Sequence, residues 1–341
     1  MRSGPVNLAQ KEERMQIPTE SGDLLKVHTT TLRAGITRTP EFEKKGLAKF
    51  AVNVGTKCGH GCLYCSTGAM LRMHGSFKAA GENPFSFGYA IVDPDTPMRV
   101  DRDARAIHAR GLIQLCTTVD AWSPEAQEHN LGRKCLDAIL SQPGWTVRIL
   151  TKNAAVAQDF DLIEQHRSRV LVGLSLTATE EKSHLVSLIE PNASPIKARM
   201  TALRAAHKRG LRTYGMLCPL MPGIADDPAS VRRLVDFVLD CGAEEIFVES
   251  VNNRGPALRL TEEALRRAEY AAEAEAVASV RRAKGWSEYT RRLLESVQAA
   301  LQRRGCIDKL RFLLYPARLT PADRQWIAAH SAGVKWLGKS K

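Results

Sequence analysis

Six short, apolar, β-prone runs alternate with segments long enough for helices in this 341-residue chain, and this alternation constrains its fold more than any other feature. The runs cover residues 47–54, 111–117, 146–151, 170–176, 212–217 and 245–249. Alternation of strand and helix implies right-handed crossovers and a parallel sheet. Six such units predict an α/β fold, in the form of an open or partial (β/α) barrel.

The helix after the fifth run has the clearest sequence signals of the connecting helices. Its apolar residues recur at the spacing of one helical face, with Asp227 at the N-cap position, Pro228 after it and Gly242 past the end. The residues of this face are Val231, Leu234, Val235, Val238 and Leu239. A similar pattern at 196–206 precedes the fifth run. Each pattern predicts an amphipathic helix that packs one face on the sheet.

The character of the sequence changes after Pro256. We therefore expect an N-terminal extension over 1–46, a barrel over 47–258 and a C-terminal extension over 259–341. The C-terminal extension should be mainly helical, with one strand and with a last helix that begins at an N-cap threonine followed by proline. Its expected elements are helical stretches at 261–284 and 287–304, the strand at 309–315 and the helix from Thr320.

Positive charge concentrates in the C-terminal extension. The chain carries 49 Lys and Arg against 37 acidic residues, a net charge of +12, and the 17 against nine in 259–341 account for +8 of it. A basic patch of this kind indicates an anionic partner, and we expect nucleic acid there. The alternative is an ordinary solvated helical face.

The sequence shows neither a signal segment nor a membrane span. The first 20 residues carry charge every few positions, and no run approaches the ~20 apolar residues that a span needs. We expect a cytoplasmic protein with no membrane partner. In a reducing cytosol, its eight cysteines favour a metal site or a reactive thiol over disulfides.

Three of the cysteines, Cys58, Cys62 and Cys65, fall within eight residues directly after the first run. Two glycines between them let the loop wrap tightly, so that all three sulfurs can face one centre. Three thiolates can hold three irons of a 4Fe–4S cluster and leave the fourth iron open for a substrate or cosubstrate. The alternatives are a zinc site that adds His60 or a distant ligand, and a ferredoxin-like site completed by a remote cysteine.

This C-x-x-x-C-x-aromatic-C pattern, with Tyr64 as its aromatic residue, resembles the signature of the radical S-adenosylmethionine (radical SAM) superfamily. The resemblance implies a 4Fe–4S cluster on Cys58, Cys62 and Cys65 whose open iron binds S-adenosylmethionine. It also implies reductive cleavage to a 5′-deoxyadenosyl radical that abstracts hydrogen from a substrate, inside a partial (β/α)6 barrel. An electron donor such as flavodoxin or ferredoxin would be a partner.

Later segments occur in an order similar to that of the spore photoproduct lyase and DNA repair photolyase-like branch of the superfamily, over roughly 47–256. They are 115–120, 149–152, 174–176, 189–191, Arg199 and 218–219. Several place polar or reactive side chains at strand ends, where barrel enzymes carry their working residues. The resemblance implies lyase-like chemistry in DNA repair.

Lys152 directly follows the third run, after the uncharged residues 149–151, so its ammonium should project over the barrel mouth. By resemblance it binds the S-adenosylmethionine carboxylate; a lysine that merely leaves the strand for solvent is the alternative. Neutral hydroxyls at strand ends suit the methionyl ammonium or the ribose. They belong to Thr117, Thr118 and Ser175. We assign Glu190 and Arg199 to the same cofactor site, as an ion pair bracing the loop after the fourth run, with a purely structural role as the alternative.

Cys116 and Tyr64 are the expected catalytic residues. By resemblance to the lyase, the Cys116 thiol returns a hydrogen atom to a product radical, whereas the alternative is a buried packing residue. Tyr64 matches a family tyrosine, but Ser66 stands where the lyase has a second one. A relay of two tyrosines is therefore absent in that form, which favours a relative with a different substrate.

These features together indicate a radical SAM enzyme that acts on a nucleic-acid or nucleotide-like substrate. The same chemistry on a peptide or small natural product is the alternative enzyme. An iron–sulfur or zinc-binding module without catalysis is the non-enzymatic alternative.

Overall fold

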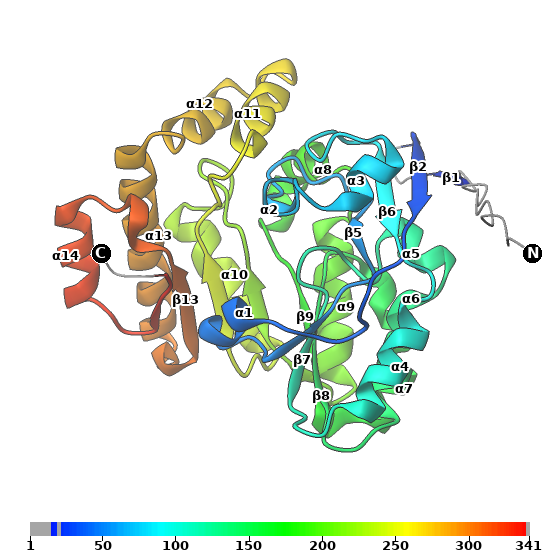
Figure 1. The fold of residues 1–341 in the computed structure, drawn as a ribbon. Coiled ribbons are helices and arrows are strands. Elements are labelled where there is room, and N and C mark those ends of the chain that lie inside the picture. Colours follow the sequence, from blue (N-terminus) through cyan, green and yellow to red (C-terminus); the bar gives the residue numbers. More distant parts are fainter. Residues whose placement is uncertain (1–14, 19–21, 339–341) are drawn as a thin grey trace, which may run out of the picture.

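The computed structural model describes residues 15–18 and 22–338 (Figure 1). Residues 1–14, on which the expected absence of a signal segment partly depends, lie outside the described residues. The same holds for 19–21 and for 339–341, which include two lysines of the basic extension. Within the described residues, no helix is long and apolar enough to cross a membrane.

A parallel sheet organises the chain, and each of the six predicted runs contributes a strand to it. The strands are β4 (Phe50–Val52), β7 (Leu112–Leu115), β8 (Thr146–Thr151), β9 (Val170–Leu174), β10 (Arg212–Thr213), β11 (Gly215–Leu217) and β12 (Ile246–Glu249). Neighbours in this order pair in parallel except β10 and β11: β10 pairs with β9, β11 pairs with β12, and a bridge between Ser175 and Met216 connects β9 to β11. The expected α/β fold with consecutive parallel strands is confirmed. The short β3 (Thr37–Arg38) pairs antiparallel with β4 at the edge.

The C-terminal extension continues this sheet. Its expected strand is β13 (Leu310–Leu314), which pairs in parallel with β12 and is followed by a short parallel strand, β14 (Val334–Trp336). A smaller sheet lies on the other side of the barrel, next to the cysteine loop (Figure 1). It consists of β1 (Met15–Pro18), β2 (Leu24–Thr29), β6 (Tyr89–Val92) and β5 (Gly55–Lys57).

The connecting helices cover the outer face of the parallel sheet. The two predicted from periodicity are α9 (Ile196–Lys208) and α10 (Pro228–Asp240), and the Asp227 side chain caps α10 by accepting from the Ser230 amide at 2.9 Å. The remaining helices before the extension are α1 (Pro40–Lys45), α2 (Thr67–Met70), α3 (Gly75–Ala80), α4 (Thr96–Ala106), α5 (Pro124–Glu128), α6 (Leu131–Leu140), α7 (Phe160–Gln165) and α8 (Ser183–Ile189).

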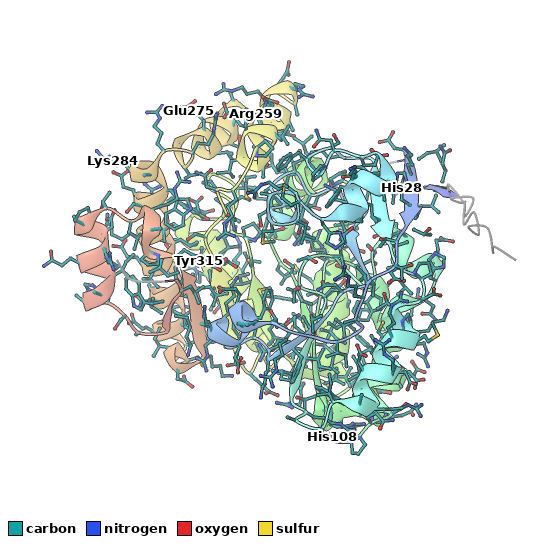
Figure 2. All side chains as sticks on the ribbon, in the orientation of Figure 1. His28, His108, Arg259, Glu275, Lys284 and Tyr315 are labelled. Atoms are coloured by element: carbon teal, nitrogen blue, oxygen red, sulfur yellow. The ribbon has the colours of Figure 1, made fainter. Side chains whose placement is uncertain are left out.

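The stretch expected to be helical over 261–284 consists of two helices and the start of a third. They are α11 (Ala257–Arg267), α12 (Ala271–Ser279) and α13 (Ala283–Arg303). The break falls at Glu269, whose φ of 65° is left-handed and ends α11. The last helix, α14 (Pro321–Ala329), begins as expected, because the Thr320 side chain accepts from the Asp323 amide. Figure 2 shows Arg259, Glu275 and Lys284 on the outer rim of α11, α12 and α13.

The inner face of the parallel strands forms a hydrophobic cluster of its own, distinct from the larger core between sheet and helices. Its members include Leu171, Tyr214, Met216, Phe247 and Leu313. Arg148 is buried among them, with its guanidinium 4.8 Å from the Tyr214 ring centroid and 4.9 Å from that of Phe247, and it pairs with Glu245. The interior is therefore packed, and the strand ends are left to carry a site.

Candidate active site

The sequence predicted that the cysteine loop follows the first barrel strand directly, and the structure differs. A separate strand, β5, intervenes after β4 and pairs antiparallel with β6. The loop is then held from two sides. The Gly59 amide donates to the Glu125 carboxylate at 3.0 Å, and the Asn192 side chain donates to the Gly59 carbonyl at 2.8 Å. These contacts hold the loop in place.

Two positions of this loop favour glycine. A Cβ at residue 59 would lie 2.3 Å from the Leu25 side chain and 2.7 Å from Glu125, and Gly61 has a φ of 67°. Both observations agree with the expected tight wrapping. The neighbouring Glu125 is buried, and this burial, only partly offset by the Ser123 hydroxyl, raises its pKa to about 7.

The three thiols of the loop line one cavity of about 180 Å³, with Cys58 and Cys62 half-buried and Cys65 exposed. Burial, with Glu190 nearby, raises the pKa of Cys62 to about 12, and burial with Glu125 raises the pKa of Cys58 well above its usual range. Both are therefore neutral thiols near pH 7, and a metal that binds them must displace their protons.

Among the described side chains, no three His, Cys, Asp or Glu converge on one metal ion. A 4Fe–4S cluster requires ligands that are farther apart than those of a single metal ion, because each thiolate binds a different iron. Three cysteine thiols around one cavity are the donor set that such a cluster uses, so the residues present fit it. Cys58, Cys62 and Cys65 are the residues that would hold it.

Six further predicted site residues line the same cavity, and two do not. Those that line it are Tyr64, Cys116, Thr117, Thr118, Lys152 and Ser175. Glu190 and Arg199 lie behind its wall, with fully buried side chains, and form the expected ion pair. Arg199 also donates to the carbonyls of Ser194 and Ser175, and Glu190 accepts from the Tyr64 hydroxyl. The pair thus braces the cavity from behind and does not face it.

Lys152 presents a positive charge to the cavity. Burial alone would lower its pKa, but the Glu190 carboxylate nearby outweighs this effect and raises the pKa above its usual value. The ammonium lies 5.7 Å from the Tyr64 ring centroid, and within the part of the chain that is described it has neither a hydrogen bond nor an ion pair. It is therefore available to an anionic group.

Two polar residues that the sequence did not single out hold the cavity wall in place. The Asn53 amide group at the end of β4 accepts from the backbone amides of Thr117 at 2.9 Å and Thr118 at 3.0 Å. The Asp120 carboxylate accepts from the Thr151 hydroxyl and from the Lys152 amide, both at 2.8 Å. Each joins the ends of two neighbouring strands, which orients the residues that face the cavity.

Cys116 lies at the end of β7 in a left-handed conformation, with a φ of 64°, and is 2% exposed. A left-handed backbone is unfavourable for a residue with a Cβ. Burial, with Asp120 nearby, raises the pKa of its thiol well above the usual range, so it keeps its proton. A second thiol at the mouth, Cys218, lies 3.6 Å from the carboxylate of Glu249.

No family model matches the chain. Among curated proteins, it is 25% identical over 220 residues to Uncharacterized protein ORF301 of the Acidianus two-tailed virus. The aligned region covers 63% of this chain and 71% of that protein. It is also 25% identical over 179 residues to Uncharacterized protein MJ0683 of Methanocaldococcus jannaschii. This aligned region covers 52% of this chain and 63% of that protein.

Among solved structures, spore photoproduct lyase complexed with dinucleoside spore photoproduct matches at a TM-score of 0.49 and 15% identity, over 71% of this chain and 66% of the lyase chain. A mutant of spore photoproduct lyase with bound AdoMet and dinucleoside spore photoproduct gives a TM-score of 0.49 and 16% identity over the same shares. The chain thus spans just under two thirds of the lyase. A likeness this distant does not show that this chain shares the activity of the lyase.

Proposed function

We propose that this protein is a radical SAM enzyme whose 4Fe–4S cluster is held by Cys58, Cys62 and Cys65. The observation that supports it best is that these thiols share one cavity with the Lys152 ammonium, which has no hydrogen bond or ion pair within the described residues. When bound, such a cluster with S-adenosylmethionine supplies one-electron cleavage of the sulfonium and a 5′-deoxyadenosyl radical.

The polar groups of the cavity suit the two charged groups on the α-carbon of the methionyl moiety. The Lys152 ammonium would bind its carboxylate. The Thr118 hydroxyl donates to Asn53 and the Ser175 hydroxyl donates to the Cys218 carbonyl, so both oxygens keep lone pairs that face the cavity. Those lone pairs would accept from the methionyl ammonium. Burial keeps the Cys116 thiol protonated, as a hydrogen donor must be.

Anaerobic reconstitution with iron and sulfide tests the proposal. We expect about four irons per chain and release of 5′-deoxyadenosine and methionine from S-adenosylmethionine on reduction with dithionite. Zinc retained without cleavage would instead mean a binding module.

For the substrate, we propose a nucleic acid or nucleotide-like molecule that meets the basic extension. Many arginines of the extension are already paired with carboxylates: Arg303 and Arg304, for example, bind Asp236 of α10. Within the described residues, several cations of the extension have no ion pair. Of these, Arg282 and Arg292 line surface hollows together with other cations, which favours them as phosphate contacts. The extensive pairing is also the observation that favours the alternative substrate, a peptide or small natural product.

Replacing Arg282 and Arg292 together by Gln should flatten the dependence of DNA binding on salt, because each phosphate contact contributes a slope of about 0.9 in log Kd against log salt on duplex DNA. We expect the slope, measured by fluorescence anisotropy, to fall by about two. Arg303→Gln is the matched control, since Arg303 is already paired. Wild-type protein with no salt-dependent binding to DNA or RNA would leave the peptide or small-molecule alternative.

Cys116→Ala should separate a hydrogen donor from a packing residue. We expect it to cost about 1 kcal/mol of stability and to leave iron content unchanged, because it removes one buried sulfur. With a substrate that the wild type converts, the variant should still release 5′-deoxyadenosine but yield products that differ from those of the wild type by mass spectrometry. Identical products with only a lower melting temperature would make Cys116 a core residue.

A further inference from the structure

The loop between α2 and α3 exposes two methionines. We call it the methionine loop and define it as residues 70–74. Met73 is 88% exposed, and Met70, the last residue of α2, is 45% exposed. Among the described residues, five large apolar side chains are exposed to this degree, and two of the five lie in this loop. Exposure of apolar side chains is unfavourable, so two of them at one place indicate a contact surface.

The methionine loop adjoins both the cavity and a basic hollow of the extension. α2 begins at Thr67, which lines the cavity, and Met70 follows three residues later, roughly 4.5 Å along the helix axis. Next to Met70, the Ala69 side chain contacts the loop after β12, since a Cβ at Gly255 would lie 3.1 Å from it. Gly255 in turn lines the surface hollow that contains Arg282. A nucleic acid bound at this hollow would therefore pass the methionine loop before it reaches the cavity.

The methionine loop is basic as well as apolar. From Cys58 to Gly81 the chain carries no acidic residue. Arg72 lies between the two methionines and Lys78 follows on α3; both are exposed, and within the described residues neither has an ion pair. Arg72 donates to the Ala69 carbonyl at 2.9 Å. Apolar tips flanked by cations are complementary to a polyanion whose phosphates enclose a stack of bases.

Contacts on both sides of Met73 hold the methionine loop in place. Leu71 packs against a small apolar cluster that consists of Phe77, Tyr89 and Ile91. At the other end, the His74 side chain caps α3 by accepting from the Ser76 amide at 3.3 Å. The exposed methionine is thus carried between two anchored residues, and its insertion into a partner does not require the loop to become ordered first.

We propose that Met70 and Met73 form a wedge that enters between stacked bases of duplex DNA, so that one base leaves the stack beside the cavity. The inference rests on the proposed nucleic-acid substrate and specifies how that substrate meets the protein. Apolar side chains, methionine among them, unstack and kink a duplex when they enter between base steps. A base that reacts inside a cavity must first leave the stack. The almost complete exposure of Met73 suits insertion better than contact with the flat surface of an acidic protein.

A duplex that contains one 2-aminopurine base tests the wedge, because the fluorescence of this base rises when it leaves the stack. We expect the full-length protein to raise the fluorescence, and we expect Met70→Ala combined with Met73→Ala to lose most of the rise. The double variant should keep its Kd for DNA within about threefold, since phosphate contacts supply much of the affinity. Met98→Ala on α4 is the matched control, because Met98 is 66% exposed and lies outside the cavity wall. An equal rise for wild type, double variant and control would overturn the proposal.

Protection from oxidation provides a second measurement on the unsubstituted, full-length protein before reconstitution. Hydrogen peroxide converts exposed methionines to sulfoxides, which mass spectrometry assigns to single residues. We expect duplex DNA to slow oxidation of Met70 and Met73 by about tenfold and to leave Met98 unchanged. Protection by a polyglutamate peptide but not by DNA would refute the wedge and assign the methionine loop to an acidic protein partner.

The two measurements separate failure of the wedge from failure of the proposed function. DNA binding with neither unstacking nor protection would refute the wedge and leave the nucleic-acid substrate in place. Wild-type protein that bound neither DNA nor RNA would contradict the proposed substrate, and the wedge with it. Iron content and release of 5′-deoxyadenosine would still decide on the radical SAM assignment, because neither depends on the methionine loop.

Discussion

Cys58→Ala, Cys62→Ala and Cys65→Ala are each expected to lose the iron–sulfur cluster and with it all cleavage of S-adenosylmethionine. Three protein ligands are the minimum for a cluster with one open iron. The mouth thiols Cys116 and Cys218 sit at other strand ends and are not part of the loop that carries the three ligands. Iron content after anaerobic reconstitution, the visible absorption of the cluster and release of 5′-deoxyadenosine measure the result.

Cys306→Ala is the matched control for these variants. Cys306 is a half-buried free thiol beyond the end of α13, outside the wall of the cavity, so its loss should leave iron content unchanged. A single loop variant that kept full iron content and cleavage would refute the cluster assignment. Because a bound cluster stabilises the folded state, the loop variants should also melt at a lower temperature than reconstituted wild type, though the packed barrel should stay folded.

The parallel strands and the cysteine loop could be predicted because their signals are local. Each strand of the barrel is a short apolar run, and the three thiols fall within eight residues. Residues at the ends of consecutive parallel strands meet at one edge of a sheet, so Cys116, Lys152 and Ser175 could be placed together without knowledge of any contact. The structure brings these three to one cavity.

The residues that orient this cavity could not be found in the same way. Asn53 is one polar residue inside an apolar run, and its partners Thr117 and Thr118 lie more than 60 positions later. Asp120 binds Lys152 across 32 positions. Neither contact leaves a periodic pattern, because each depends on which strands become neighbours. A polar residue that interrupts the end of an apolar strand was the available signal for Asn53.

Local conformation explains the other differences. The break between α11 and α12 occurs at Glu269, where neither glycine nor proline marks it, since the left-handed turn is made by a residue that rarely adopts one. The strand β14 has three residues, two of them exposed, so no alternation identifies it. For Glu190 and Arg199, the sequence suggested the ion pair but not how deeply it is buried. Both side chains are completely buried, and the pair lies behind the cavity wall.

That burial leads to the second large effect: Arg199→Met should destabilise the protein by about 3–5 kcal/mol, because it leaves the Glu190 carboxylate buried without its partner. Burial alone would raise the pKa of Glu190, yet Arg199 and Lys152 hold it below its usual value, so the pair contributes stability at neutral pH that is lost as the pH falls through the acid range. The midpoint of urea unfolding, followed by circular dichroism, measures the change.

Two further variants decide whether the lost charge partner is the cause. Lys197→Met on the same helix removes an exposed cation, 3.4 Å from Glu180, and should change stability by less than about 0.5 kcal/mol. Glu190→Gln combined with Arg199→Met removes both charges and should recover much of the loss, because no uncompensated carboxylate remains. If the free energy of unfolding of Arg199→Met were within about 1 kcal/mol of the wild-type value, the ion pair would not brace the cavity. Since Glu190 accepts from the Tyr64 hydroxyl, the destabilised variant should also bind S-adenosylmethionine more weakly than Lys197→Met does.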